Sequence, residues 1–190
     1  MGNKASMQLQ QEEITDIQTE TGFSSNQIVR LYSRFTRLDK NNRGVLTRED
    51  FLRIPELAIN PLGDRIVHSF FLESQCETVN FKQFMSVLAR FRPTKSKEIK
   101  NKLNTREEKL KFAFRMYDLD CDQKISRDEL LAVLHMMVGD NISEEQLNSI
   151  ADRTIAEADE DGDRMISFEE FKKVMERVDV EQKMSIRFLN

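Results

Sequence analysis

The sequence predicts an all-α protein of two lobes, in which each lobe pairs two helix–loop–helix units and short β pairing joins the loops. Apolar residues recur at helical spacing on both sides of four polar stretches, which is the pattern of amphipathic helices flanking loops. The four units form an internal repeat, and 190 residues suffice for two small lobes. We therefore predict an N-terminal lobe over residues 1–91, a basic linker over 92–107 and a C-terminal lobe over 108–190.

The first two units belong to the predicted N-terminal lobe. In the first unit, one helical face carries apolar side chains before a polar stretch at 39–50, namely Ile28, Leu31, Tyr32 and Phe35. The second unit opens with Asn60 and Pro61, which favour a helix start because Asn caps helices and Pro is tolerated at the first helical position. A second polar stretch follows at 74–78.

The last two units belong to the predicted C-terminal lobe. Apolar residues flank their polar stretches at helical spacing, from Leu110 to Met137 and from Leu147 to Val178. Ser143 with Gln146 forms a capping box, which predicts where the fourth unit's first helix begins.

The segment between the lobes is basic. From Arg92 to Arg106 it holds six Lys or Arg residues and one acid, Glu98, and Pro93 is expected to end the preceding helix. Two interpretations stay open at this point. The segment is either a solvated linker or a docking patch for an acidic partner or anionic lipid.

Composition excludes several classes of function. The net charge of −4 gives no basic field for nucleic acid. No run of about 18 apolar residues exists, and the N-terminus lacks the apolar segment of a secretory signal. Cys76 and Cys121 form no C-x-x-C pair, which predicts a reducing, cytoplasmic compartment. No nucleophile with a base and an orienting group is apparent, so we expect no enzyme.

Two polar stretches in the C-terminal lobe carry oxygen donors at a spacing that fits calcium. Ca²⁺ takes about six to eight oxygen ligands, and a 12-residue loop supplies them from positions 1, 3, 5, 7, 9 and 12. The third loop offers at these positions Asp118, Asp120, Asp122, the backbone carbonyl of Lys124, Ser126 through water, and Glu129. The fourth loop offers Asp159, Asp161, Asp163, the backbone carbonyl of Met165, Ser167 and Glu170.

This donor pattern is that of the EF-hand, and it predicts two bound Ca²⁺ ions, one in each loop. Ser126 with Glu129 and Ser167 with Glu170 could be capping boxes alone. However, four carboxylates per loop would repel one another strongly without a cation. The three aspartates that precede each box therefore favour metal binding.

Positions 6 and 8 refine this prediction. Ile125 and Ile166 occupy position 8, where they can face one another in a short strand pair that couples the two sites. Position 6 is usually Gly because the turn is left-handed, but here it is Gln123 and Arg164. A left-handed residue costs about 1–2 kcal/mol, so we expect binding to survive.

The first and second loops are predicted to be empty. In the first, Arg43 places a cation at ligand position 5, and Asp50 at position 12 is one methylene short of a bidentate glutamate. The second loop has no carboxylate at positions 1, 3, 5 and 12, which are Leu72, Ser74, Cys76 and Gln83. These loops are expected to hold their helix pairs together without metal.

Both termini carry further signals. Met1 to Ser6 fits M-G-x-x-x-[ST], which predicts N-myristoylation at Gly2 after Met removal. A single myristoyl chain gives only marginal membrane anchoring. The tail from Asp179 to Asn190 sets apolar residues among polar ones, and it could be core packing or a movable plug for a groove.

Four segments resemble the calcineurin B homologous proteins and, more distantly, calcineurin B: residues 31–35, 53–65, 124–130 and 178–189. The resemblance implies myristoylation and calcium at the third and fourth EF-hands. It also implies that a hydrophobic groove binds the juxtamembrane cytoplasmic helix of a plasma-membrane sodium/proton exchanger and supports its activity and surface stability. Calcineurin inhibition and a part in vesicle and protein transport are further implications.

We accordingly predict a calcium-binding regulatory protein that captures an amphipathic target helix. The alternatives are a calcineurin B-type phosphatase regulatory subunit, which would bind the calcineurin catalytic subunit, and a simple calcium buffer. The expected location is cytoplasmic, peripheral at the plasma membrane and endomembranes. Residues 130–137 and 142–155 resemble the family's nuclear export segments, so shuttling is possible, although the same leucines suit a helix core.

Overall fold

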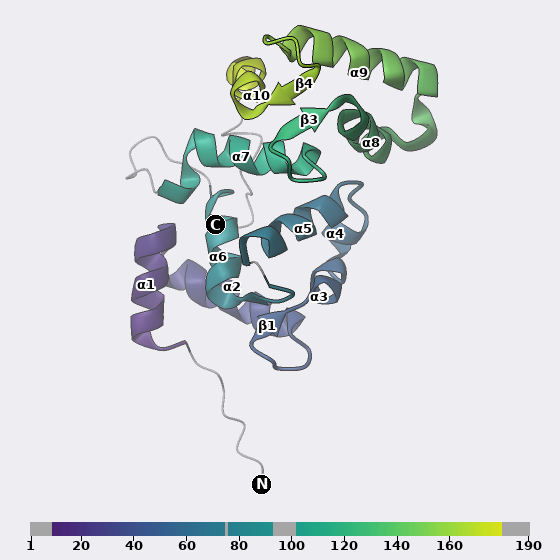
Figure 1. The fold of residues 1–190 in the computed structure, drawn as a ribbon. Coiled ribbons are helices and arrows are strands. Elements are labelled where there is room, and N and C mark those ends of the chain that lie inside the picture. The colour runs from purple at the N-terminus through teal and green to yellow at the C-terminus, as the bar shows by residue number, and fades with distance from the viewer. Residues whose placement is uncertain (1–8, 75, 93–101, 180–190) are drawn as a thin grey trace.

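A computed structural model describes residues 9–74, 76–92 and 102–179 of the chain. It is mostly helical, with two short antiparallel strand pairs, as the sequence predicts (Figure 1). The predicted acceptor Gly2, the residues 93–101 of the basic linker and the tail from 180 onward lie outside the described residues. Within the described part, no helix is both long and apolar enough to cross a bilayer.

The N-terminal lobe consists of the elements up to α6. They are α1 (Gln11–Thr21), α2 (Ser25–Leu38), β1 (Val45–Leu46), α3 (Arg48–Leu52), α4 (Pro55–Ala58), α5 (Gly63–Ser74), β2 (Val79–Asn80) and α6 (Phe81–Ala89). The strands pair antiparallel, with Val45 opposite Asn80 and Leu46 opposite Val79.

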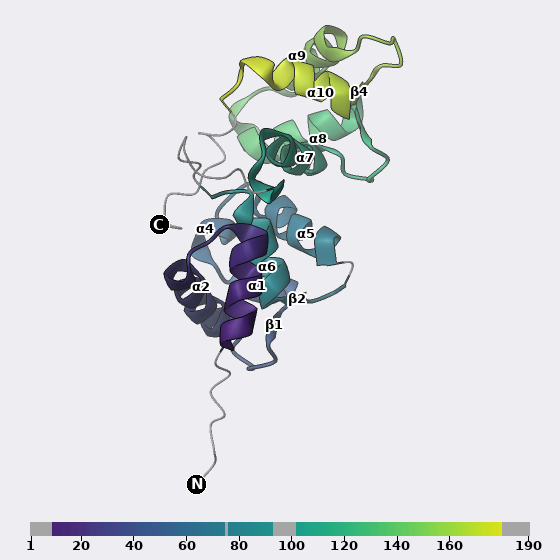
Figure 2. The same cartoon turned by 90° about the vertical axis from the view of Figure 1, so that its left-hand side faces the viewer.

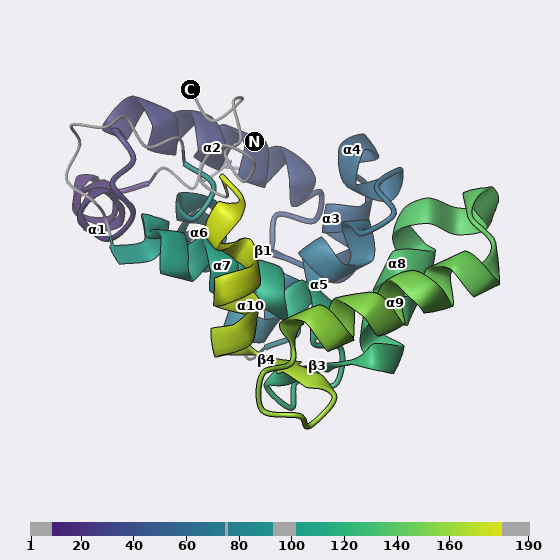
Figure 3. The ribbon, with the colours of Figure 1, turned by 90° about the horizontal axis from the view of Figure 1, so that it is seen from above.

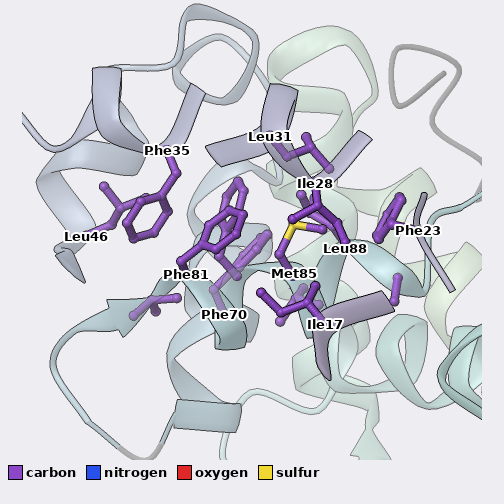
Figure 4. Packing of buried hydrophobic residues seen from close by; sticks show 14 of the residues in the cluster. Ile17, Phe23, Ile28, Leu31, Phe35, Leu46, Phe70, Phe81, Met85 and Leu88 are labelled. Atoms are coloured by element: carbon purple, nitrogen blue, oxygen red, sulfur yellow. The ribbon is translucent and has the colours of Figure 1, made fainter. Parts of the chain in front are cut away.

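A buried aromatic cluster holds this lobe together (Figure 4). The ring of Phe35 packs edge-on against Phe81 at 5.3 Å between centroids, and Phe51 packs against Phe70 at 4.8 Å. These residues come from α2, α3, α5 and α6, so the cluster joins the two helix–loop–helix units. Such ring pairs add about 0.5–1.5 kcal/mol each beyond area burial.

Two helix starts differ from the sequence prediction. The helix α1 was not predicted; Gln10 and Glu13 form its capping box, and Ile14 and Ile17 bury its apolar side beside α6 (Figure 2). The helix α5 begins at Gly63 rather than at Pro61. A side chain at residue 63 would collide with the Leu57 carbonyl of α4, so this helix start requires glycine.

The C-terminal lobe consists of the elements from α7 onward. They are α7 (Arg106–Tyr117), β3 (Lys124–Ser126), α8 (Arg127–Val138), α9 (Glu144–Ala158), β4 (Met165–Ser167) and α10 (Phe168–Val174), with short 3₁₀ turns at Gly139–Asn141 and Met175–Arg177. A further 3₁₀ turn, Lys102–Asn104, precedes α7, and its Leu103 packs against the N-terminal cluster. Figure 3 shows α8 and α9 lying side by side. Ser143 caps α9 and Ile125 pairs with Ile166 across β3 and β4, which confirms both predictions.

The helix α7 connects the lobes. Its Phe112 packs into the N-terminal cluster, whereas its Phe114 packs against Phe168 and Phe171 of the C-terminal lobe. From α5, the Arg65 guanidinium donates hydrogen bonds to the carbonyl oxygens of Arg115 (2.8 Å), Met116 (3.3 Å) and Asp118 (3.0 Å). Those carbonyls at the C-terminal end of a helix lack intrahelical partners, so a cation there is favourable.

A buried lysine fixes the start of α7. Lys109 is fully buried, and its ammonium group donates to the Asn104 side chain at 2.7 Å and to the Arg90 carbonyl. Arg106, which the sequence places in the basic linker, is the first residue of α7. Its guanidinium donates to the Met175 carbonyl at 2.6 Å, and this hydrogen bond connects the start of α7 to the turn that follows α10.

Candidate metal centre

The third loop closes through Glu129. Ser126 caps α8, and Glu129 Oε2 accepts hydrogen bonds from the Ser126 amide (2.8 Å) and hydroxyl (2.7 Å). Its Oε1 accepts from the amides of Leu119 (2.7 Å) and Asp120 (3.2 Å) at the start of the loop. Burial raises the pKa of Glu129, but these hydrogen bonds outweigh it and hold the pKa below its usual value.

Asp118, at position 1 of the third loop, is a buried carboxylate with one unsatisfied oxygen. Its Oδ2 accepts the Gln123 amide at 3.2 Å, whereas Oδ1 has no hydrogen-bond partner among the described residues. Burial raises the pKa of Asp118, and the charges of Glu129 and Asp122 raise it further. A buried, unpaired carboxylate oxygen is costly unless a cation neutralises it.

The carboxylates gather into one cluster per loop. In the third loop, oxygens of Asp118, Asp120 and Asp122 all lie within 4.8 Å of one another. In the fourth loop, the corresponding cluster consists of Asp159, Asp161 and Glu170, with the same 4.8 Å limit. Of the eight predicted carboxylate ligands, Glu129 and Asp163 lie outside these groups.

The fourth loop closes as the third does. Glu170 Oε1 accepts the Glu160 amide at 2.8 Å, and Oε2 accepts the Ser167 amide and hydroxyl, both at 2.7 Å. Because two backbone segments donate to this carboxylate, Glu160 first and then Ser167, the pKa of Glu170 falls to about 2. Asp159 accepts the amides of Gly162 (2.7 Å) and Arg164 (2.8 Å), which shapes the loop around its first ligand.

The turn at position 6 has the left-handed backbone that the sequence predicts. Gln123 has φ 73° and Arg164 has φ 64°. The amides of both residues donate to the aspartate at position 1 of their own loop, and these hydrogen bonds help to hold the strained turn. Lys124 and Met165, whose carbonyls are the position 7 donors, follow directly and begin β3 and β4.

These residues fit a calcium ion. Every candidate donor is an oxygen, as a hard cation requires, and the buried Asp118 Oδ1 has no other partner in the described part of the chain. The carboxylates of Asp118, Asp120, Asp122 and Glu129 would hold the ion in the third loop, with the Lys124 carbonyl. Asp159, Asp161, Asp163, Glu170 and the Met165 carbonyl would do so in the fourth.

The first loop has its own cation. Arg43, at position 5, places a guanidinium nitrogen 2.9 Å from Asp50 Oδ2 and another 4.0 Å from Asp39 Oδ1. Arg53, which sequence reasoning missed, binds the other oxygen of Asp50 at 3.1 Å. Burial would raise the pKa of Asp50, but hydrogen bonds from Thr47 and the charges of both arginines lower it.

The second loop offers no carboxylate at ligand positions 1, 3, 5 and 12. Gln83, at position 12, exchanges hydrogen bonds of 2.9 Å with Asn80 and forms the capping box of α6. Val79 is buried and pairs with Leu46 of the first loop. The loop therefore contributes strand pairing to the lobe.

Long-range partners are the part of the site that spacing did not reveal. Lys124 contributes a backbone carbonyl to the third loop, as predicted, but its ammonium group also contacts Asp163 of the fourth loop. Arg65 reaches the Asp118 carbonyl from the other lobe. The sequence around Arg65 gave no signal of this role, because its acceptors lie about fifty positions away.

The paired loops and their flanking helices define an EF-hand protein, and comparison with known proteins agrees. The EF-hand domain pair family matches residues 107–176. The calcineurin B subunit of Naegleria gruberi is 46% identical over 187 residues, which cover 98% of this chain and 99% of that protein. The type 1 calcineurin B subunit of Dictyostelium discoideum is 39% identical over 189 residues, 99% of each chain.

The chain belongs to the calcineurin B-like EF-hand family. It is a calcium-binding regulatory protein of calcineurin B type and not an enzyme. The resemblance of the sequence segments indicated the calcineurin B homologous proteins first and calcineurin B more distantly. Both relatives are named calcineurin B subunits, so they favour calcineurin B instead. Among the described residues, the segments that carried the resemblance lie in α2, in α4 with the start of α5, and in β3 with the start of α8.

Proposed function

We propose that the chain is the regulatory subunit of a calcineurin-type phosphatase and that it holds two Ca²⁺ ions, in the third and fourth loops. The observation that carries the metal assignment is the buried Asp118 oxygen, which lies without a partner in the described residues beside Asp120 and Asp122. The partner assignment is supported by full-length similarity to two proteins named as calcineurin B subunits.

The mode of binding is capture of an amphipathic helix of the catalytic subunit. Met136 and Met137 on α8 and Ile150 on α9 are exposed apolar residues on two adjacent helices. Methionine adapts to irregular apolar surfaces, and paired EF-hands bind target helices on such faces. The sodium/proton exchanger helix is the competing target; the named relatives give it no support.

A calorimetric titration of the full chain tests the metal assignment. Wild type is expected to bind two ions, and Glu129→Ala combined with Glu170→Ala none, because each change removes a bidentate ligand. Asp128→Ala combined with Glu169→Ala is the matched control, since these acids occupy the neighbouring position 11 and leave the ligands intact. Two ions bound by the first double variant would refute the loop assignment.

A binding assay tests the partner. Purified calcineurin catalytic subunit and an exchanger juxtamembrane peptide are titrated separately into the calcium-loaded chain. Tight binding of the catalytic subunit, lost on Met136→Glu and Met137→Glu, is the expected result. Binding of the exchanger peptide alone would replace the proposed partner with the exchanger. Binding of neither would favour a calcium buffer.

A further inference from the structure

One contact connects the two candidate calcium loops through side chains. Lys124 begins β3 and lies opposite Ser167 of β4, and its side chain reaches across the strand pair to Asp163. The Lys124 ammonium group contacts Asp163 Oδ2, and the Met165 amide donates to Asp163 Oδ1 at 2.8 Å. Both oxygens of this position 5 ligand are therefore bound by groups of the protein.

The third loop provides an internal comparison. Asp122 occupies position 5 there, and its Oδ1 accepts the amide at position 7 at 2.8 Å, as Asp163 Oδ1 does in the fourth loop. Yet Asp122 joins the carboxylate cluster of its loop, whereas Asp163 does not join its own. Among the interactions of the described residues, the contact with the lysine distinguishes the two aspartates.

We propose that the Lys124 ammonium group is a built-in competitor for the ion of the fourth loop. It binds the oxygen of Asp163 that the backbone leaves free, and an ion entering the fourth loop must displace it to gain its full ligand set. This inference rests on the proposed calcium sites. Because the Lys124 carbonyl is a ligand position of the third loop, one residue links the occupancy of both sites.

The expected effect is modest. The side chains of Lys124 and Asp163 are 42% and 31% exposed, so water and salt screen their attraction. Contacts of this kind change an equilibrium by about two- to fivefold. Loss of the ammonium group should therefore tighten calcium binding in the fourth loop by about two- to fivefold, with a smaller change in the third.

A second lysine serves as the matched control. Lys173 also contacts an acid of the fourth loop, but that acid is Glu160 at position 2, which is not a ligand position. Lys173→Met removes the same charge from beside an acid of the fourth loop without releasing a ligand. A general charge effect would make both variants bind calcium equally well, whereas direct competition affects Lys124→Met alone.

The experiment follows the amide NMR signals of Ile125 and Ile166, one in each loop, during calcium titration of the full-length chain. Lys124→Met and Lys124→Gln should shift the Ile166 titration to lower calcium, and Lys173→Met should not. Unchanged affinity in both Lys124 variants, or an equal gain in Lys173→Met, would overturn this inference while leaving the calcium sites intact. If wild type and all variants bound no ion, the proposed function would fail as well.

Discussion

The first and third loops differ in the charges that surround the buried aspartate at position 1. Each begins with a buried aspartate, Asp39 at 4% and Asp118 at 5% exposure, and in each the Oδ1 of that aspartate has no hydrogen bond among the described residues. The first loop brings the guanidinium of Arg43 to its carboxylates, whereas the third brings further carboxylates. A loop that buries a carboxylate at position 1 therefore needs a central positive charge, supplied either by the chain or by an ion.

The same contrast extends to the ends of the loops. Position 12 is Asp50 in the first loop, where Arg43 and Arg53 bind its two oxygens. It is Glu129 in the third, where backbone amides and Ser126 occupy the oxygens. Stability of the N-terminal lobe should thus be independent of calcium, and stability of the C-terminal lobe should depend on it.

Calcium removal is the largest perturbation that tests this difference. An ion that binds only the folded state adds about 4 kcal/mol per site at a thousandfold excess over its Kd, and a chelator withdraws this contribution. We expect hydrogen exchange to accelerate strongly in α7 to α10 and little in α1 to α3. Equal acceleration in both lobes, measured by mass spectrometry on the full chain, would contradict the comparison.

Arg43→Met removes the internal cation of the first loop. Breaking a buried ion pair costs several kcal/mol, but the Arg43 side chain is 40% exposed, so we expect a loss of about 1–2 kcal/mol. Urea unfolding of the N-terminal lobe in chelator measures the loss. Arg30→Met is the control, because it removes the same charge from the exposed face of α2. Equal stability of the two variants would show that Arg43 does not replace an ion.

The sequence predicted the elements that depend on local spacing. The D-x-D-x-D runs and the capping boxes follow from positions within one loop, and the structure has that geometry. The pairing of Ile125 with Ile166 follows from the repeat, because each residue occupies position 8 of its own loop. The contacts of Lys124 with Asp163 and of Arg65 with α7 join residues 39 and about 50 positions apart. No periodicity encodes such contacts, because the first depends on a side chain that crosses the β3–β4 pair and the second on how α5 packs against α7.

Acid provides the next test, through Asp50. The pKa of this carboxyl is lowered in the folded chain, so its ionised form stabilises the fold above its usual value of 3.8. That stabilisation is lost as the pH falls below 3.8 through the folded pKa, because protonation releases both arginines. In chelator, Asp50→Asn should flatten the acid side of the N-terminal lobe's stability profile. A profile as steep as that of wild type would show that groups other than Asp50 cause the acid sensitivity.

The smallest effect concerns position 6, where the two loops again differ. Gly44 fills it in the first loop at φ 73°, and Gln123 fills it in the third at the same φ 73°. Glycine adopts this backbone freely, whereas a side chain there adds about 1 kcal/mol of strain. Gln123→Gly should therefore stabilise the calcium-free C-terminal lobe by up to about 1 kcal/mol, and Gly44→Ala should destabilise the N-terminal lobe by a similar amount. Because the φ values are equal, a higher melting temperature for Gln123→Gly together with a lower one for Gly44→Ala would trace the effect to backbone strain. Melting temperatures that shift in the same direction would trace it to contacts of the substituted side chains.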